Sequence, residues 1–228
     1  MRVLVRLLPA LLLPCLLAAC IFGGGGDRPK PPRQSARQSA RPAPSAPTSR
    51  ETRQCEANLT RAGYSFRSLP DRDFGGGCSI EGAVQLLDIG VPVTGIKAMR
   101  CGLADKFTGW ITHGVRPAAI QILGSDVVRV ETFGTYACRN IRGNAAYSTK
   151  RSEHAHANAV DISGFTLADG RHITIEKDWN SSDPQIRRFM EIIHRSACKR
   201  FRTVLSPDYN AAHYNHFHMD MGGGTFCR

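Results

Sequence analysis

The sequence predicts an α+β domain in which flanking helices and disulfide bonds accompany a small antiparallel sheet. Two segments carry apolar residues at helical spacing, and several short runs of β-branched and aromatic residues lie between turn residues. Six cysteines follow residue 54. Helical and strand periodicities in one short chain favour the α+β class, and an even number of cysteines favours disulfide pairs.

Helices are expected where apolar residues recur three or four positions apart, because this spacing places them on one buried face. Ser79 can cap a helix, Pro117 and Gly124 delimit another, and Pro184 occupies a first turn, where proline is favoured. The expected helices are 79–87, 99–111, 118–123 and 184–197.

Strands are expected in short runs of β-branched and aromatic residues. Ala168-Asp169-Gly170 separates two such runs and predicts a hairpin. Residues 55–78 and 140–151 are expected to be loops. The expected strands are 91–93, 126–138, 160–167, 172–175, 203–205 and 215–221.

Residues 1–19 have the layout of a secretory signal, with two arginines before a short apolar run. They lead into Leu17-Ala18-Ala19-Cys20, which resembles the bacterial lipobox and implies lipidation of Cys20. A plain signal peptide cleaved near Ala19 is the alternative. Because Ile21 is not the aspartate that retains lipoproteins in the inner membrane, the resemblance implies a bacterial cell-envelope protein. Its lipid anchor is expected at the periplasmic face of the outer membrane.

Residues 20–53 are expected to be a disordered tether. From Asp27 to Arg53 the chain is rich in Pro, Ser, Ala, Arg and Gln, and such a segment cannot bury a core. The folded domain is therefore expected at 54–228. That part holds 21 basic and 17 acidic residues, so it carries only +4 of the formal net charge of +11. A nucleic-acid partner is not expected without a basic face, whereas a cationic tether suits an anionic wall or lipid surface.

The six cysteines of the folded part are expected to form three disulfides, because the chain has the features of an exported protein. No C-x-x-C spacing suggests that they bind zinc. Pairing along the chain gives Cys55–Cys78, Cys101–Cys138 and Cys198–Cys227, one of fifteen arrangements that six cysteines allow.

Histidines and aspartates concentrate in residues 152–161, SEHAHANAVD, and in residues 213–220, HYNHFHMD. Imidazole and carboxylate are good zinc ligands, and a catalytic zinc usually takes three of them and keeps one position open. His216 and His218 are two apart, so a strand would place both on one face, together with Asp220.

His154 and Asp161 are seven residues apart, so they can converge only across a bend, in which Asn158 could lie. Glu153 and Asp220 are candidates for orienting the ligand histidines through hydrogen bonds.

The two segments resemble the zinc peptidases grouped with lysostaphin, the D-Ala-D-Ala metallopeptidases and the hedgehog signalling domain. Their first motif, S-x-H-x-x-G-x-A-x-D, is matched from Ser152 to Asp161, with Ala157 in place of the glycine. Their second motif, H-x-H, is matched by His216-Phe217-His218. The resemblance implies one zinc ion bound by His154, Asp161 and His218, with His216 as the catalytic histidine.

Two further residues are expected to contact substrate. His213 precedes His216 by three residues, a spacing also found in penicillin-insensitive murein endopeptidases, where this histidine lines the site. Tyr136 to Arg139 resembles an S-G-Y-R-S segment of the D-Ala-D-Ala peptidases with Cys138 inserted. The resemblance implies that Arg139 binds a substrate carboxylate, which its guanidinium fork suits. An ordinary surface arginine beside a disulfide is the alternative.

A wider resemblance extends from Cys55 to Cys227, to the bacterial extensin-like C-terminal family. It rests on ordered stretches that include Tyr136-Ala137-Cys138-Arg139, Ser152-Glu153-His154-Ala155, 158–165, Asp169-Gly170-Arg171 and His216-Phe217-His218.

These resemblances imply a membrane-anchored, zinc-dependent peptidase that hydrolyses an amide bond in peptidoglycan. The alternative is a non-catalytic peptidoglycan-binding or structural lipoprotein with the same fold, since hedgehog domains use this zinc constellation for binding. A metal-dependent nuclease is disfavoured, because the folded part is only mildly basic. The sequence leaves the oligomeric state and the identity of the divalent metal open.

Overall fold

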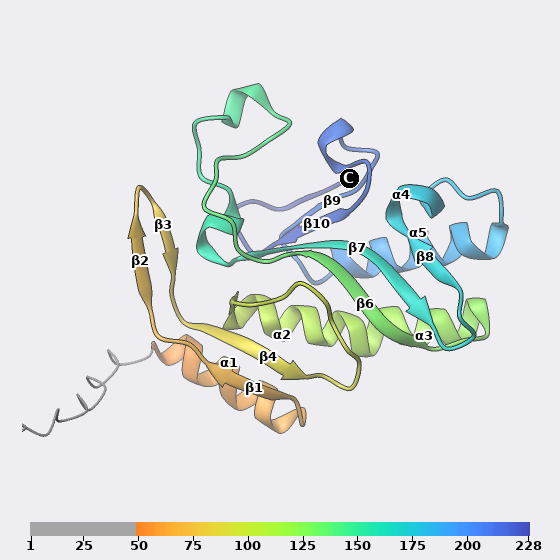
Figure 1. Cartoon of the computed structure of the whole chain (residues 1–228), viewed down its shortest axis with the longest axis horizontal. Helices are drawn as coiled ribbons and strands as arrows, with labels where there is room; N and C mark the ends of the chain where they lie inside the picture. The colour runs from red at the N-terminus through yellow and green to blue at the C-terminus, as the bar shows by residue number, and fades with distance from the viewer. Residues whose placement is uncertain (1–48) are drawn as a thin grey trace, which may run out of the picture. The chain divides into compact units, whose positions relative to one another are not determined.

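The structure of the protein is a computed structural model, and it describes residues 49–228. Its central sheet consists of β6 (Val127–Gly134), β7 (Ala159–Leu167), β8 (His172–Thr174), β9 (Thr203–Leu205), β10 (Phe217–Asp220) and β11 (Phe226–Cys227). The strand order is β11-β9-β10-β7-β6, and β8 also pairs with β7 (Figure 1). The pair β11–β9 is parallel, and the other pairs of this sheet are antiparallel. The predicted α+β class with antiparallel pairing is thus confirmed.

Two long helical segments pack against the central sheet. The first comprises α2 (Cys101–Trp110), π-helical turns at Ile111–Val115, α3 (Arg116–Ala118) and further π-helical turns at Ala119–Leu123. It ends where Gly124 takes the left-handed conformation (φ 69°) that favours glycine at a helix end. The second is α5 (Pro184–Cys198), capped by Asp183, and a short α4 (Ile175–Asp178) precedes it. The helices expected at 99–111, 118–123 and 184–197 are confirmed, the first two as one continuous segment.

The core lies between these helices and the sheet. The Trp110 ring contacts Phe165 of β7 and Phe201, with ring centroids 6.2 and 6.3 Å apart. Its Nε1 donates a hydrogen bond of 3.0 Å to the carbonyl oxygen of Ile193 in α5. Apolar side chains of β7 and β10, including Ile162 and Phe217, complete the same buried cluster.

The chain before α2 differs from the prediction. It forms α1 (Arg50–Arg61), β1 (Ser65–Ser68), β2 (Arg72–Gly75), β3 (Cys78–Ile80), β4 (Ala83–Asp88) and β5 (Met99–Arg100). These strands make a sheet of order β1-β4-β5 and a separate β2–β3 hairpin.

The expected helix 79–87 is therefore wrong, and so is the expected loop at 55–78. Gly82 takes a positive φ of 53°, which interrupts a helix, and residues 83–88 extend beside β1. The helix α1 starts inside the expected tether because Ser49 caps it, its hydroxyl accepting a hydrogen bond from the backbone N–H of Thr52.

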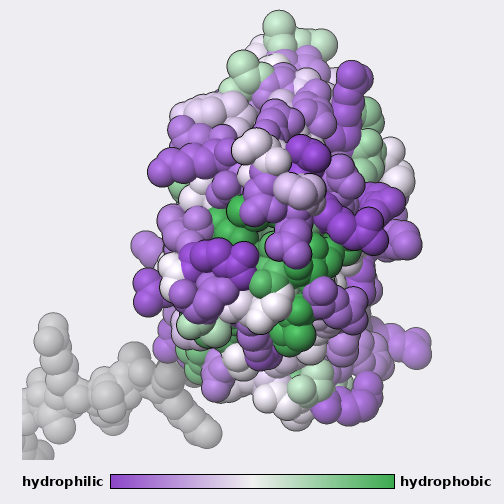
Figure 2. Space-filling model, turned by 90° about the vertical axis from the view of Figure 1, so that its right-hand side faces the viewer, coloured by the Kyte–Doolittle hydropathy of each residue, from purple (hydrophilic) through white to green (hydrophobic). Residues whose placement is uncertain are grey.

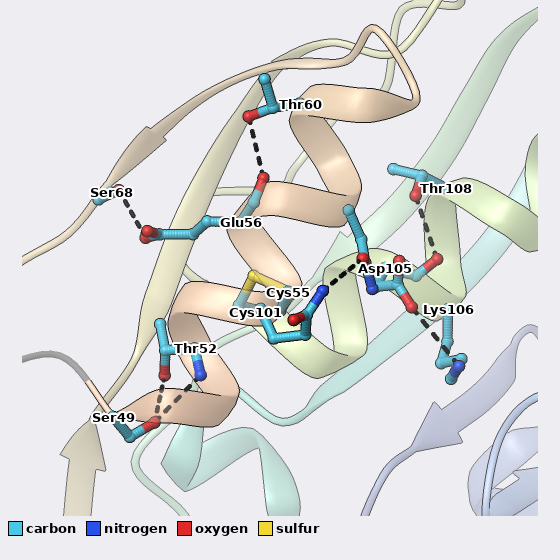
Figure 3. Close-up of a disulfide and its surroundings, with 12 residues drawn as sticks. Ser49, Thr52, Cys55, Glu56, Thr60, Ser68, Cys101, Asp105, Lys106 and Thr108 are labelled. Atoms are coloured by element: carbon cyan, nitrogen blue, oxygen red, sulfur yellow. Dashed lines mark hydrogen bonds and ion pairs between the residues drawn. A yellow bond between two sulfur atoms is a disulfide. The ribbon is translucent and has the colours of Figure 1, made fainter.

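Three disulfides are present, as expected, but two of the expected pairings are wrong. The bonds are Cys55–Cys101, Cys78–Cys138 and Cys198–Cys227. Figure 3 shows that the first links α1 to α2. Because α1 packs on α2, Cys55 meets Cys101 rather than Cys78, and Cys78 in the β2–β3 hairpin meets Cys138 beyond β6.

The face that Figure 2 shows is mainly polar, with an apolar area that hydrophilic side chains surround. Single exposed apolar residues such as Ile120 and Val128 are also present and are common on folded domains. Within residues 49–228, no helix has the length and apolar character needed to cross a membrane.

We expect the Trp110 contact to stabilise the packing of α2 and α5. Trp110→Phe removes the hydrogen bond to Ile193 and leaves unfilled volume, so it should lower the free energy of unfolding by about 1–3 kcal/mol. Urea denaturation followed by circular dichroism measures this change. The matched control is Trp179→Phe, because Trp179 is half-buried and its Nε1 bonds the exposed Asp208. An equal loss in both variants would contradict the assigned role of Trp110.

Candidate metal centre

Three side chains meet with their ligand atoms directed at one another. His154 Nε2 lies 3.0 Å from Asp161 Oδ1 and 3.2 Å from His218 Nδ1, and His218 Nδ1 lies 2.9 Å from Asp161 Oδ1. All three residues are buried. Zinc with bonds of about 2.0–2.1 Å in tetrahedral geometry needs ligand atoms about 3.3 Å apart. The three observed separations are close to that value, so the donor set fits a tetrahedral metal.

The pairing of β7 with β10 places two of these residues side by side. In that antiparallel pair His218 stands opposite Asp161, and Phe217 stands opposite Ile162. Successive side chains of a strand point to opposite faces. Phe217 and Ile162 join the helix-covered core, and His218 and Asp161 therefore share the other face, where they line a cleft.

His154 reaches the cluster from a short 3₁₀ turn, η4 (Glu153–His156), just before β7. The Ser152 hydroxyl accepts a hydrogen bond from the His154 N–H and caps this turn. Ala157 follows with φ 51°, a left-handed conformation that is unfavourable for alanine. The chain does bend between His154 and Asp161, but the residue that reverses it is Ala157, one position before Asn158. This is the motif position at which the resembling zinc peptidases carry glycine.

A second carboxylate, that of Asp220, orients one of the candidate ligands. His218 Nε2 lies 2.9 Å from Asp220 Oδ2, so the Asp220 carboxylate accepts its N–H and leaves Nδ1 directed at the cluster. Such a contact on the second ring nitrogen is typical of metal-binding histidines. Glu153 does not contact a histidine in this way, since its carboxylate accepts a hydrogen bond of 2.6 Å from the Asn158 side chain.

His216 and His213 extend the cluster along the cleft. His216 Nε2 lies 3.6 Å from Asp161 Oδ1, and the ring centroid of His213 lies 5.1 Å from that of His216. Each ring bonds an asparagine through Nδ1: Asn215 at 2.9 Å for His216, and Asn210 at 2.7 Å for His213. Because an amide oxygen only accepts hydrogen bonds, Nε2 of each ring is left unprotonated when the imidazole is neutral.

The charges of the cluster follow from burial and hydrogen bonding. Burial lowers the pKa of His213 to about 4 and also lowers the pKa of His216, so both rings are neutral near pH 7. Burial opposes ionisation of both Asp161 and His218, but their hydrogen bonds outweigh its effect. Hydrogen bonds with His154 and His218 hold the pKa of Asp161 well below its usual range. Hydrogen bonds with Asp161 and Asp220 raise the pKa of His218 to about 9. With this raised pKa, His218 is protonated on both ring nitrogens near pH 7, so a metal that binds Nδ1 must displace the proton there.

Arg139 lies at the edge of the cluster. Its Nη2 is 4.0 Å from Asp161 Oδ2, and burial lowers the pKa of its guanidinium. The cleft in which these groups lie has a volume of about 850 Å³. Four basic residues line it: Arg139, Arg142, Lys150 and Arg151.

The structure brings together all six residues predicted for the site: His154, Asp161, His218, His216, His213 and Arg139. Cys20, the predicted lipidation site, lies outside the described residues. Sequence reasoning missed Asn210 and Asn215, although asparagine three residues before His213 and next to His216 was a visible signal. His194, Cys198 and Cys227 form another group of potential ligands in the described chain, but a disulfide joins both cysteines.

The protein-family comparison agrees with the extent of the folded part. A family described as Extensin-like protein C-terminus matches residues 53–228, which include the candidate metal centre and all three disulfides. No curated protein and no solved structure matches the chain. Because the family match covers most of the chain, the protein belongs to the extensin-like C-terminal family.

Proposed function

We propose that this protein is a zinc-dependent peptidase that hydrolyses an amide bond in peptidoglycan peptides. The observation that carries the proposal is the convergence of His154, Asp161 and His218 on one point, with His216 Nε2 beside it. A pure structural or binding protein has no need of a proton-accepting nitrogen next to such a donor set. The proposal also rests on the zinc-peptidase motifs that these residues match.

His154, Asp161 and His218 would hold one zinc ion, since two imidazoles and a carboxylate are a common catalytic donor set. When bound, zinc supplies Lewis acidity, which activates water and polarises a carbonyl group. The protein prepares this site in two ways. Asp220 keeps the His218 ring directed at the cluster, and the register of β7 and β10 fixes the distance to Asp161.

His216 would accept the proton that is released when water attacks the amide. Burial keeps its ring neutral near pH 7, and the Asn215 contact leaves Nε2 as the basic nitrogen. Nε2 also faces the metal ligands, 3.6 Å from Asp161. The same proton can then pass to the leaving amine, as general acid–base catalysis requires. His213 would line the substrate side of the same cleft.

Arg139 would bind a carboxylate of the peptide. Its guanidinium lies at the cluster, and Arg142 and Lys150 give the nearby cleft wall a positive charge. Peptidoglycan peptides carry carboxylates, which a guanidinium fork binds in two-point geometry. The lipobox and the cationic tether support the same substrate, because they would hold the domain at a membrane beneath the wall. We accordingly propose a cell-envelope, lipid-anchored protein, with its anchor at the periplasmic face of the outer membrane.

Digestion of purified peptidoglycan can distinguish the proposed role of His216 in proton transfer from that of His218 in zinc binding. We expect the full-length protein with zinc to release fragments from purified peptidoglycan, detected by mass spectrometry, and chelation to stop the release. His216→Ala should lower the rate by about 10²–10⁴-fold, the usual range for a general base, and should retain zinc. His218→Ala should lose both zinc and activity.

The control for these variants is His113→Ala, because His113 is exposed on the first helical segment and far in sequence from the cleft-lining residues. It should behave as wild type. If the wild-type protein binds zinc and wall material but releases no fragment from several wall types, the non-catalytic binding function replaces the peptidase.

Asp220 should contribute to metal affinity without touching the metal. Asp220→Asn weakens the acceptor for His218 Nε2, and we expect zinc affinity to fall by about 10–100-fold. Competition titration with a chromophoric chelator measures the constant. Asp208→Asn is the matched control, because Asp208 bonds Trp179 and does not line the cleft. Unchanged affinity in Asp220→Asn would show that the carboxylate does not orient the ligand.

A further inference from the structure

One loop crosses from the Arg139 side of the cleft to the His213 side. Its ends are joined where Asn140 and Arg151 form an antiparallel bridge, and the Ile141 N–H donates to the Lys150 carbonyl at 2.9 Å. We call residues 141–150 between these ends the strap. Several strap residues line the cleft: Ile141, Arg142, Asn144, Tyr147 and Lys150. A ligand that fills the cleft therefore lies against the strap.

The far side of the strap is held by residues just before His213. Asn210 Nδ2 donates a hydrogen bond of 3.1 Å to the Gly143 carbonyl, and Asn144 Nδ2 donates one of 3.3 Å to the Tyr209 hydroxyl. Gly143 has φ 76°, and a Cβ at this position would lie 2.6 Å from the Ala212 Cβ. Only glycine allows the strap to approach the 209–213 segment this closely.

The other end of the Asn210 side chain contacts His213. Asn210 Oδ1 lies 2.7 Å from His213 Nδ1 and also accepts the Ala212 N–H at 3.0 Å. The Ala212 N–H needs an acceptor and the Gly143 carbonyl needs a donor. These two backbone groups therefore fix the orientation of the Asn210 side-chain amide. The oxygen faces His213, so Nδ1 must donate, and the unprotonated Nε2 is left for the cleft.

We propose that Asn210 is a positioning residue that couples the strap to His213: one carboxamide holds the strap through Gly143 and sets the orientation and tautomer of the His213 ring. Movement of the strap, which an occupant of the cleft contacts, then changes how His213 is presented. The consequence for catalysis rests on the proposed peptidase function, whereas the coupling itself does not.

Three substitutions separate the two ends of this contact. Gly143→Ala pushes the strap off Ala212 and away from Asn210, and it replaces neither Asn210 nor His213. Asn210→Asp keeps an acceptor for His213 but loses the donor to Gly143. Asn210→Ala loses both. The matched control is Gly170→Ala in the β7–β8 turn, which introduces similar backbone strain (φ 88°) with no atom within 4 Å of the new Cβ.

Two measurements on the full-length protein test the coupling without any need for activity. Hydrogen–deuterium exchange reports strap opening, and we expect the strap amides to exchange about two- to tenfold faster in all three variants, as loss of one hydrogen bond predicts. Nitrogen-15 NMR reports the His213 tautomer, with its signals assigned by their loss in His213→Gln. Wild type should be protonated at Nδ1, Asn210→Ala should show a tautomer mixture, and Gly143→Ala should shift the same ring signals. Gly170→Ala should change neither measurement.

The proposal is overturned if Gly143→Ala speeds strap exchange and leaves the His213 ring signals unchanged, or if Asn210→Ala leaves strap exchange unchanged. If the wild-type protein digests wall material, the coupling further predicts a lower kcat in Gly143→Ala at unchanged zinc affinity. If it digests none, the peptidase function fails. The hydrogen-exchange and NMR results still decide whether Asn210 couples the strap to His213.

Discussion

The antiparallel register of β7 and β10 is the constraint on which the candidate centre depends. It sets His218 opposite Asp161 on the cleft face, while Phe217 and Ile162 lie opposite each other in the core. A shift of one residue would exchange the two faces. It would bury His218 among apolar side chains and expose Phe217 in the cleft. The hydrophobic core and the polar cluster therefore depend on the same register, because a one-residue shift would lose both.

The third candidate ligand, His154, is positioned by a turn and not by strand pairing. His154 comes from a turn that Ser152 caps and that ends in a left-handed Ala157. An alanine in this conformation costs roughly 1–2 kcal/mol, and glycine would avoid the cost. The Ala157 side chain is fully buried, and its carbonyl accepts the Arg100 N–H at 2.8 Å. Packing and hydrogen bonding around Ala157 thus hold a turn that its own backbone preference opposes.

Sequence reasoning succeeded where a local pattern determines the structure. The apolar spacing of 99–111 and 186–197 predicted two helices, and Asp169-Gly170 predicted the β7–β8 turn. The three residues that the motif resemblance implied as metal ligands also lie together in the fold. Sequence reasoning failed where distant contacts decide: β4 extends because β1 pairs with it, and Cys55 bonds Cys101 because α1 packs on α2. The contacts of the strap could not be predicted from the sequence either, because Gly143 and Asn210 are far apart in the chain and meet only when it folds.

The histidines of 213–218 share a feature that their sequence spacing alone does not explain. In each ring one nitrogen bonds a side-chain oxygen of a residue at most three positions away: Asn210 for His213, Asn215 for His216 and Asp220 for His218. The second nitrogen of each ring is thereby left for the cleft. Residues 210–220 consequently contain both the imidazoles and the groups that orient them. The rest of the fold then has to fix only the position of this segment, through the core contacts of Phe217 and Met219, for all three rings to be presented at once.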